Sequence, residues 1–222
     1  MKLFFTILCL FNNFYNMNII LDHFPNLSDD QKNKFLELEK IYKFWNSKIN
    51  VISRKDIDNI FLHHILHSLS IAKFVDFKAG TSILDLGTGG GFPGVPLSIF
   101  FPECNFNLVD SVKKKVDVVN AVCKDLNLKN ITTYKSRAED LNLKYDFMVS
   151  RAVAKISKLL KWSKHCCNPD SKNSIKNGII VLKGGDLNEE LKSVPYKTII
   201  KLNEIFDYEY FQQKQIVYIP QG

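Results

Sequence analysis

One stretch of the 222-residue chain decides how it folds: Ile83-Leu84-Asp85-Leu86-Gly87-Thr88-Gly89-Gly90-Gly91-Phe92-Pro93-Gly94. Its apolar start, residues 82–86, predicts a short buried β-strand that runs directly into a glycine-rich turn. Glycines at this point let the backbone turn tightly and let a ligand approach it closely. Four of the five residues from Gly87 to Gly91 are glycine, which favours a ligand-binding turn over a purely structural one.

The spacing of these glycines separates two classes of cofactor. A dinucleotide fingerprint needs a third glycine at position 92, which is occupied by Phe92. The remaining pattern, an acidic residue followed by G-x-G-x-G, suits an adenosine ligand without a pyrophosphate, such as S-adenosylmethionine. Asp110 ends a second predicted strand roughly 20 residues beyond Gly87, where a carboxylate accepts hydrogen bonds from ribose hydroxyls. The alternatives are a turn or helix-capping role for Asp110 and an NAD- or nucleotide-dependent oxidoreductase.

Outward from this turn, strands and helices alternate along the chain. Further strands are predicted over residues 105–109, 131–134, 146–150 and 178–182, with a closing pair over 198–202 and 215–219. Helices are predicted over residues 96–101, 112–126 and 155–165, and a surface loop over 168–177. The alternation predicts an α/β fold with a mostly parallel sheet and helices on both faces.

Three regions are predicted from these patterns: an α/β domain over residues 78–222, a helical N-terminal layer over 17–77, and a short extension over 1–16. The layer contains two helical patterns, one behind the capping box at Ser28 and one over residues 57–75. The extension has a basic start and an apolar run, like a signal peptide, but no small-residue cleavage site follows. We interpret it as dispensable or as an incorrectly assigned start, with Met17 as the working start.

Composition and charge are those of a globular protein. Hydrophobic residues make up 45% of the chain and charged residues 24%, which excludes a disordered or collagen-like chain. The formal net charge of +7 suits a polyanionic partner. The five cysteines include no C-x-x-C pair, so we expect neither a disulfide framework nor a cysteine zinc site, and free cysteines fit a reducing cytoplasm.

Three histidines fall in the second predicted helix: His63, His64 and His67. A metalloprotease helix needs His-Glu-x-x-His, and no glutamate follows His63 or His64. We therefore predict no metal site, and we expect these histidines to face solvent or RNA from the helix surface.

The chain resembles the bacterial ribosomal small-subunit RNA methyltransferase G family, also called glucose-inhibited division protein B, from about Met17 to Tyr218. The most specific motifs are G-F-P-G-x-P-L at residues 91–97 and S-R-A at residues 150–152. Further matches are W-N-S-K-I-N-V at 45–51, H-I-L-H-S at 64–68, R-A-E at 137–139 and L-K-G at 182–184. Many members have arginine where this chain has His63 and aspartate where it has His67.

The resemblance implies a Rossmann-like class I S-adenosylmethionine-dependent methyltransferase that methylates N7 of one guanine in 16S rRNA near the decoding site. Its expected partner is 16S rRNA or the small ribosomal subunit, its expected location the cytoplasm without a membrane, and its default state a monomer. The family's cofactor contacts fall on Gly87, Phe92, Ala138, Glu139 and Arg151, and the glycine-turn argument adds Gly89, Gly91 and Asp110 to the same pocket.

Guanine N7 carries a lone pair and no proton, so no catalytic base is assigned. Arg151 is expected to hold the cofactor, a base edge or a phosphate, or alternatively to pair with Glu139 or Asp85. RNA contact is predicted for the cations Lys113, Lys114, Lys115 and Arg137. The three lysines open a helix, where the helix dipole disfavours positive charge, which favours a role in phosphate binding. A small-molecule or protein methyltransferase and a noncatalytic rRNA-binding module remain competing hypotheses.

Overall fold

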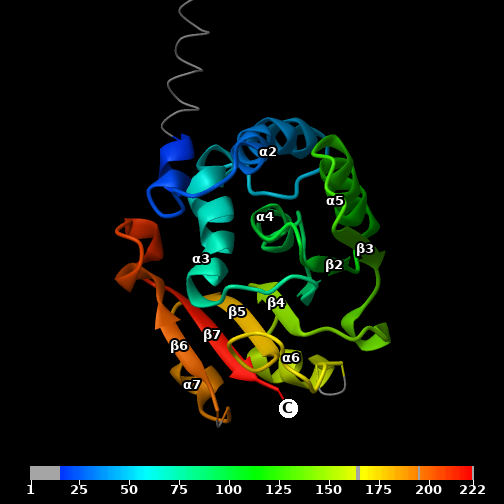
Figure 1. Cartoon of the computed structure of the whole chain (residues 1–222), viewed down its shortest axis with the longest axis vertical. Helices are drawn as coiled ribbons and strands as arrows, with labels where there is room; N and C mark the ends of the chain where they lie inside the picture. Colours follow the sequence, from blue (N-terminus) through cyan, green and yellow to red (C-terminus); the bar gives the residue numbers. More distant parts are fainter. Residues whose placement is uncertain (1–15, 164–165, 195, 222) are drawn as a thin grey trace, which may run out of the picture.

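The computed structural model describes residues 16–163, 166–194 and 196–221. In these residues a seven-stranded sheet has the order β3-β2-β1-β4-β5-β7-β6 (Figure 1). The strands are β1 (Ser82–Leu86), β2 (Asn105–Asp110), β3 (Ile131–Lys135), β4 (Phe147–Arg151), β5 (Gly178–Gly184), β6 (Thr198–Lys201) and β7 (Lys214–Pro220). Strands β1 to β5 pair in parallel, and β7 lies antiparallel between β5 and β6. The predicted mostly parallel sheet and its closing pair of strands are confirmed.

Helices cover both faces of this sheet, as predicted. One face packs against α2 (Asp29–Lys48), α3 (His67–Phe74), α4 (Gly94–Phe100) and α5 (Lys113–Asp125), and the other against α6 (Ile156–Ser163) and α7 (Asn188–Leu191). Short 3₁₀ turns are η1 (Ile57–Asn59), η3 (Ala138–Asp140), η4 (Leu202–Glu204) and η5 (Glu209–Phe211), while η2 (Ile60–Leu66) is a π-helix. The helix predicted over residues 57–75 is therefore a 3₁₀, π and α succession, which ends at Phe74.

The N-terminal layer is tied to α4 and to the glycine-rich turn by two side chains of α2. Ser28 and Gln31 form the predicted capping box, and the Gln31 amide also donates to the carbonyls of Ile99 and Phe100 at 3.0 Å each. Further along α2, the buried Tyr42 hydroxyl donates to the Gly90 carbonyl at 2.6 Å. Helix α2 thus braces α4 and the glycine-rich turn that precedes it.

Most of the 1–16 extension lies outside the described residues, and the choice of start stays a prediction. Residues 16–21 are helical, and the Met17 side chain is buried in the core. Within the described chain, no helix combines the length and apolar character needed to cross a membrane.

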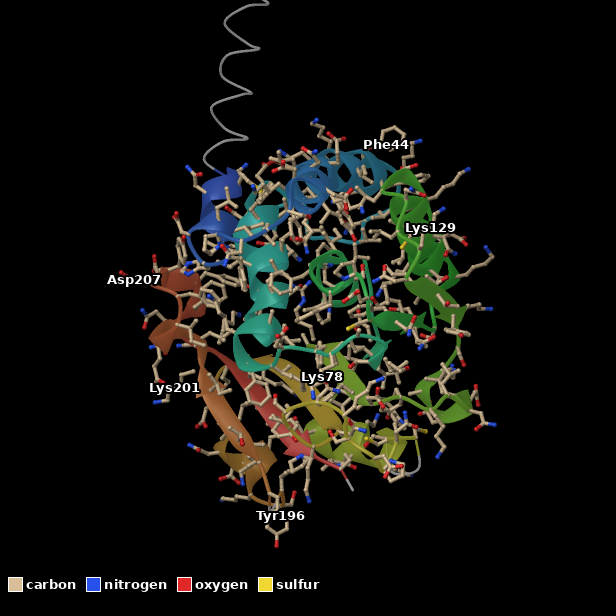
Figure 2. The ribbon with its side chains drawn as sticks, in the orientation of Figure 1. Phe44, Lys78, Lys129, Tyr196, Lys201 and Asp207 are labelled. Atoms are coloured by element: carbon tan, nitrogen blue, oxygen red, sulfur yellow. The ribbon has the colours of Figure 1, made fainter. Side chains whose placement is uncertain are left out.

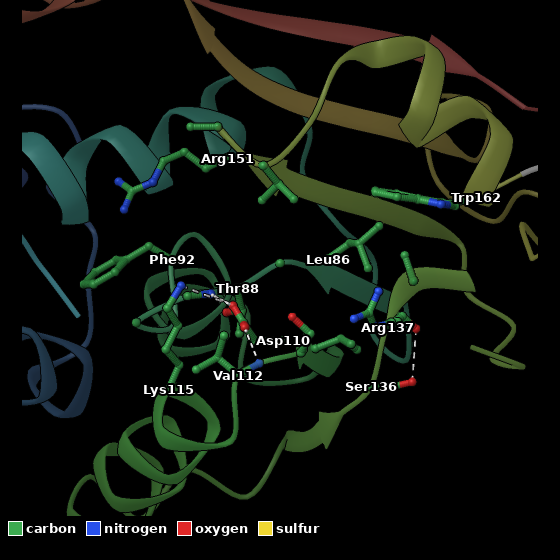
Figure 3. Close-up of a pocket in the computed structure, with 18 of the residues that line it drawn as sticks. Leu86, Thr88, Phe92, Asp110, Val112, Lys115, Ser136, Arg137, Arg151 and Trp162 are labelled. Atoms are coloured by element: carbon green, nitrogen blue, oxygen red, sulfur yellow. Dashed lines mark hydrogen bonds and ion pairs between the residues drawn. The ribbon is translucent and has the colours of Figure 1, made fainter. Parts of the chain in front are cut away.

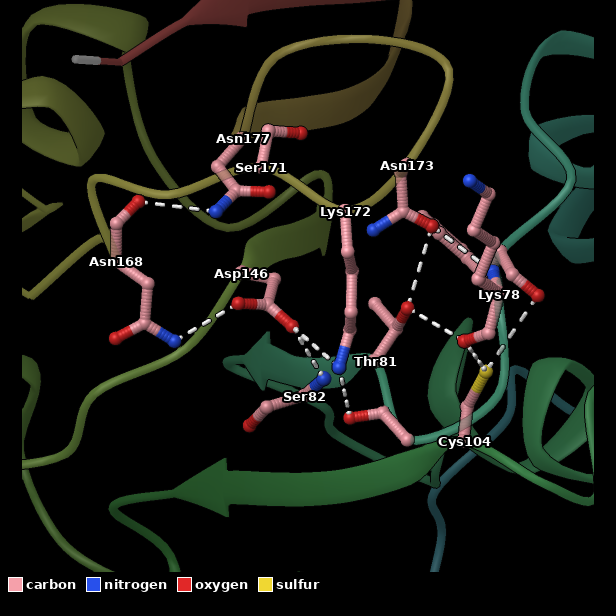
Figure 4. A network of polar contacts seen from close by, with 12 residues as sticks. Lys78, Thr81, Ser82, Cys104, Asp146, Asn168, Ser171, Lys172, Asn173 and Asn177 are labelled. Carbon is pink, nitrogen blue, oxygen red and sulfur yellow. Dashed lines mark hydrogen bonds and ion pairs between the residues drawn. The ribbon is translucent and has the colours of Figure 1, made fainter.

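The loop predicted over residues 168–177 lies at the amino ends of β1 and β4 and is held by a polar network (Figure 4). The Asp146 carboxylate accepts from the Asn168 amide at 2.8 Å and from the Ser82 backbone amide at 2.9 Å. The Lys172 ammonium donates to the Gly80 carbonyl at 2.6 Å. These contacts fix the end of the sheet opposite the glycine-rich turn.

The buried carboxylate of Asp85 shapes the turn after β1. Asp85 is fully buried, and its Oδ2 accepts from the Thr88 hydroxyl at 2.6 Å and from the Gly94 backbone amide at 2.8 Å. The two donors lie at the start of the turn and at the first residue of α4. A Cβ on Gly94 would lie 2.7 Å from the same oxygen, so glycine is required there. Burial raises the pKa of Asp85 to about 6, although the bonds from Thr88 and Gly94 oppose the rise.

This raised pKa predicts a pH-dependent contribution to stability. Because the folded carboxyl binds its proton more tightly than the unfolded one, whose pKa is 3.8, ionising Asp85 destabilises the fold as the pH rises from about 4 to 6. Asp85→Asn removes this titration at nearly the same shape. The free energy of unfolding of the wild type minus that of the variant should fall by roughly 2–3 kcal/mol from pH 4 to pH 7.

Urea unfolding at each pH measures this difference. Asp207→Asn, which changes an exposed carboxyl (Figure 2), is the matched control for effects of charge removal. A difference for Asp85→Asn that stays constant or grows with pH would contradict the assignment of Asp85 as a carboxyl that burial disfavours in its charged form.

Candidate cofactor-binding site

A cavity of about 690 Å³ opens at the carboxyl ends of β1 to β4 (Figure 3). Strand order reverses at β1, because the chain moves from β1 outward to β2 and β3 and then returns to β4 on the other side. Ligands of open α/β sheets bind at this kind of switch point. The volume lies within the roughly 300–1,000 Å³ of small-molecule sites.

Each of the four strands contributes the segment that follows it. The lining residues are Leu86 to Gly90 and Phe92 after β1, Val109 to Val112 and Lys115 after β2, Ser136 to Glu139 after β3, and Arg151 to Val153 after β4, together with Val51 and Trp162. Figure 3 shows Arg151 and Phe92 at one side of the cavity and Trp162 and Arg137 at the other. The cavity therefore has two distinct ends.

Seven of the eight residues predicted to contact the cofactor line this cavity: Gly87, Gly89, Phe92, Asp110, Ala138, Glu139 and Arg151. Gly91 is not a lining residue. It has a φ of +96°, and a Cβ there would lie 2.7 Å from Val95 and 2.8 Å from the Tyr42 hydroxyl. Gly91 thus lets the turn pack closely on α2 and α4, which is a structural reason for that glycine.

Asp110 has the turn role that the sequence left open as an alternative to ribose binding. Its Oδ2 accepts from the Gly89 backbone amide at 3.0 Å, and its Oδ1 accepts from the Val112 backbone amide at 2.8 Å. These bonds fix the turn before α5 to the glycine-rich turn. A carboxylate has about four acceptor sites, so Asp110 keeps capacity for hydroxyl donors of a ligand. The Lys115 ammonium lies 3.9 Å from Oδ2.

Arg151 is held by groups that the sequence did not indicate. Its Nη1 donates to the His63 carbonyl at 3.1 Å, its Nη2 donates to Nδ1 of His64 at 2.9 Å, and the guanidinium lies 5.1 Å from the centre of the Phe92 ring. Among the described residues, Arg151 forms no ion pair with Glu139 or Asp85, so the expected alternative pairing is wrong. The guanidinium is instead hydrogen-bonded to the N-terminal layer at this end of the cavity.

The expectation that the histidines face solvent or RNA is wrong for two of them. His64 and His67 are buried, at 9% and 4% exposure, and His63 is half-buried. The Tyr210 hydroxyl donates to the His63 carbonyl at 3.1 Å and lies 3.0 Å from Nδ1 of His67, while the His63 ring stacks on the Tyr210 ring. The C-terminal segment around Tyr210 packs over this helix. The local sequence around the histidines does not predict that contact.

The cations predicted to contact RNA divide into two pairs. Lys115 and Arg137 line the cavity. Lys113 and Lys114 are exposed on α5 outside it, and the Lys113 ammonium pairs with Asp117 at 2.7 Å. Within the described chain, no group of three or more His, Cys, Asp or Glu side chains is placed to hold a metal ion.

The apolar rim of the cavity was not predicted from the sequence. Val112 and Val153 are 45% and 41% exposed at its mouth, and Val51 and Trp162 reach it from the N-terminal layer and α6. Only Val51 belongs to a motif, as the last residue of W-N-S-K-I-N-V, and the fold brings the four residues together. The flat indole ring of Trp162 suits the face of a purine ring, and the valines add apolar surface.

The hydrogen-bonding groups that line the cavity fit S-adenosylmethionine. Gly87 and Gly89 have φ values of +70° and +58°, and a Cβ on Gly87 would lie 2.5 Å from Val153, so the turn presents bare backbone to the cavity. Asp110 offers acceptors for ribose hydroxyls, and Arg151 offers N–H donors for a carboxylate. S-adenosylmethionine has no pyrophosphate, so its site needs no cluster of cations.

Comparison of the chain with solved structures shows the fold. MtNAS in complex with MTA and tNA has a TM-score of 0.57 at 10% identity and covers 86% of this chain and 74% of that one. TrmN from Thermus thermophilus has a TM-score of 0.51 at 12% identity and covers 68% of this chain and 46% of that one. At these identities the likeness concerns the fold alone.

Comparison with known sequences shows the family. The model of the GidB family, rRNA small subunit methyltransferase G, matches residues 31–217. Ribosomal RNA small subunit methyltransferase G of Christiangramia forsetii is 50% identical over 204 residues, which are 92% of this chain and 97% of that protein. The protein of the same name from Porphyromonas gingivalis is 50% identical over 206 residues, 91% of this chain and 92% of that protein. The chain therefore belongs to the rRNA small subunit methyltransferase G family and is a methyltransferase of small-subunit ribosomal RNA.

Proposed function

We propose that the cavity binds S-adenosylmethionine and that the enzyme uses it in the cytoplasm to methylate N7 of one guanine in 16S rRNA near the decoding site. The observation that carries the cofactor site is the placement of Asp110 and Arg151 at the carboxyl ends of β2 and β4, on opposite sides of the glycine-rich turn after β1. A ligand that carries ribose hydroxyls and, further along, a carboxylate would span these two groups.

The polarity of the cavity orients the cofactor. Asp110 would hold the ribose hydroxyls, and the segment from Ser136 to Glu139 with Trp162 would surround the adenine. Arg151 would bind the carboxylate of the amino-acid end. When bound, S-adenosylmethionine supplies a methyl group on a positively charged sulfur.

Methyl transfer to guanine N7 requires the side chains mainly to position the two reactants. Guanine N7 has a lone pair and no proton, so no residue has to remove one, and a general base is unnecessary. Holding two reactants in a reactive geometry supplies roughly 7–11 kcal/mol of barrier reduction. The apolar mouth formed by Val112 and Val153 would receive the guanine ring and exclude water from the reacting atoms.

Transfer of a labelled methyl group tests the activity. Protein incubated with S-adenosyl-[methyl-³H]methionine and either small subunits or naked 16S rRNA from a strain without this gene should place label at a single N7-methylguanine. Arg151→Ala should lower kcat/KM at least 10-fold, because a charge-assisted hydrogen bond contributes about 1.5–3 kcal/mol. Intact cofactor binding with label on neither RNA would contradict the rRNA assignment and favour a small-molecule or protein substrate.

The two cations at the cavity predict where RNA phosphates lie. Lys115→Gln and Arg137→Gln should each lower the slope of log affinity against log salt by about 1, since each removes one phosphate contact. Filter binding of 16S rRNA at several salt concentrations, without cofactor, measures the slope.

Lys201→Gln is the matched control, because this exposed lysine lies on β6 at the far edge of the sheet (Figure 2). A slope that Lys201→Gln lowers as much as Lys115→Gln would show that the cavity mouth is not the preferred phosphate contact.

A further inference from the structure

We propose that Asp56 and His64 are positioning residues that hold the guanidinium of Arg151 where it receives the carboxylate of the cofactor. The proposal rests on the proposed function, since it concerns the amino-acid end of the same cavity. It assigns a role to two buried or half-buried polar groups of the N-terminal layer that do not line the cavity themselves.

The three side chains form a continuous hydrogen-bonded chain. Oδ2 of Asp56 lies 2.8 Å from Nε2 of His64, and Nδ1 of His64 lies 2.9 Å from Nη2 of Arg151. An arginine guanidinium can only donate, so Nδ1 of His64 must accept. The proton of the neutral ring then sits on Nε2 and is donated to the carboxylate of Asp56. The partners thus fix both the tautomer and the orientation of the ring.

The charge state of His64 agrees with this pattern. Burial and the neighbouring charge of Arg151 lower the pKa of His64 to about 4, against the opposing effect of Asp56. A neutral imidazole therefore lies between a cation and an anion. The imidazole therefore links Asp56 to Arg151 by hydrogen bonds and places no second positive charge beside the guanidinium.

Asp56 is itself fixed at both oxygens. Its Oδ1 bonds to Nδ1 of His63, whose ring stacks on Tyr210 with centroids 3.9 Å apart. The carbonyl of His63 accepts from both Arg151 and the Tyr210 hydroxyl. The arginine is thus held by a side chain and a carbonyl from the same turn of the π-helix, a helix form that often occurs at functional sites.

The guanidinium retains donors after these contacts. Arginine carries five N–H donors, and two are used by His63 and His64. The Phe92 ring lies against the guanidinium and also 5.0 Å from the His64 ring, which limits the rotation of both. The remaining donors keep a fixed direction, as a planar carboxylate requires for a strong paired contact.

Calorimetry tests this positioning role by comparing the affinities of the cavity for two ligands. S-adenosylhomocysteine carries both the adenosine and the amino-acid end, whereas 5′-methylthioadenosine lacks the amino acid. His64→Phe keeps an aromatic ring but removes the acceptor, so it should weaken S-adenosylhomocysteine about 10-fold or more. Its affinity for 5′-methylthioadenosine should change less than about twofold. His64→Asn, which can place an amide oxygen near the position of Nδ1, should recover part of the loss.

A double-mutant cycle tests whether His64 acts through Arg151. In an Arg151→Ala background, His64→Phe should cause no further loss of S-adenosylhomocysteine affinity, because the group it positions is gone. His23→Phe is the matched control, because His23 packs against Phe206 and Tyr208 and is not one of the residues that line the cavity; it should change affinity by about twofold at most. Asp56→Ala replaces the other end of this hydrogen-bonded series, and its side chain is only half-buried. If His64→Phe fails to fold, Asp56→Ala should show the same selective loss of S-adenosylhomocysteine affinity.

The outcomes separate the two proposals. A wild-type protein that binds neither ligand overturns the proposed cofactor site and the positioning role with it. A wild-type protein that binds both, with His64→Phe and Asp56→Ala losing both ligands equally, overturns the positioning role alone. Losses from His64→Phe and Arg151→Ala that simply add would overturn it as well.

Discussion

The carboxylate of Asp85 is the contact on which the rest of the site depends. It lies at the end of the central parallel strand β1, and one of its oxygens binds donors from Thr88 and from Gly94. These two bonds close the glycine-rich turn and start α4 in a fixed direction. The Tyr42 hydroxyl binds the same turn from α2 at the carbonyl of Gly90. The turn is thus shaped from within by β1 and braced from outside by the N-terminal layer.

The cavity follows from this turn and from the order of the strands. Because β1 lies between β2 and β4, the segments after those strands flank the turn on its two sides. Asp110 is fixed on one side by backbone amides, and Arg151 is fixed on the other by the π-helix of the N-terminal layer. The layer is therefore part of the site rather than an appendage, since it supplies the groups that hold the arginine. A ligand that carries ribose hydroxyls and a carboxylate would find one partner at each side.

The sequence predicted the central features of the fold because they are local. The glycine-rich turn, the acidic end of β2 and the alternation of strands with helices each follow from short-range patterns. The family resemblance placed Phe92, Ala138, Glu139 and Arg151 at the cavity, and the structure brings all four there. Element boundaries differed by a residue or two, as for β4, which begins at Phe147.

What the sequence did not predict depends on contacts between distant segments. His67 is buried because Tyr210 folds over it, and Arg151 pairs with His64 across 87 residues of sequence. The π-helix shifts the phase of the helix that carries the histidines, so a regular helical period assigns their faces wrongly. Gly91 is explained by its close packing against Tyr42 and Val95, which no spacing rule distinguishes from ligand contact.

A crystal structure of the protein with S-adenosylhomocysteine tests the central claim most directly. The two-ended cavity predicts ribose hydroxyls within hydrogen-bond distance of the Asp110 carboxylate and the ligand carboxylate on the guanidinium of Arg151, with His64 still bound to both Arg151 and Asp56. A ligand bound in the reverse direction, or bound without contact to Asp110 and Arg151, would contradict it.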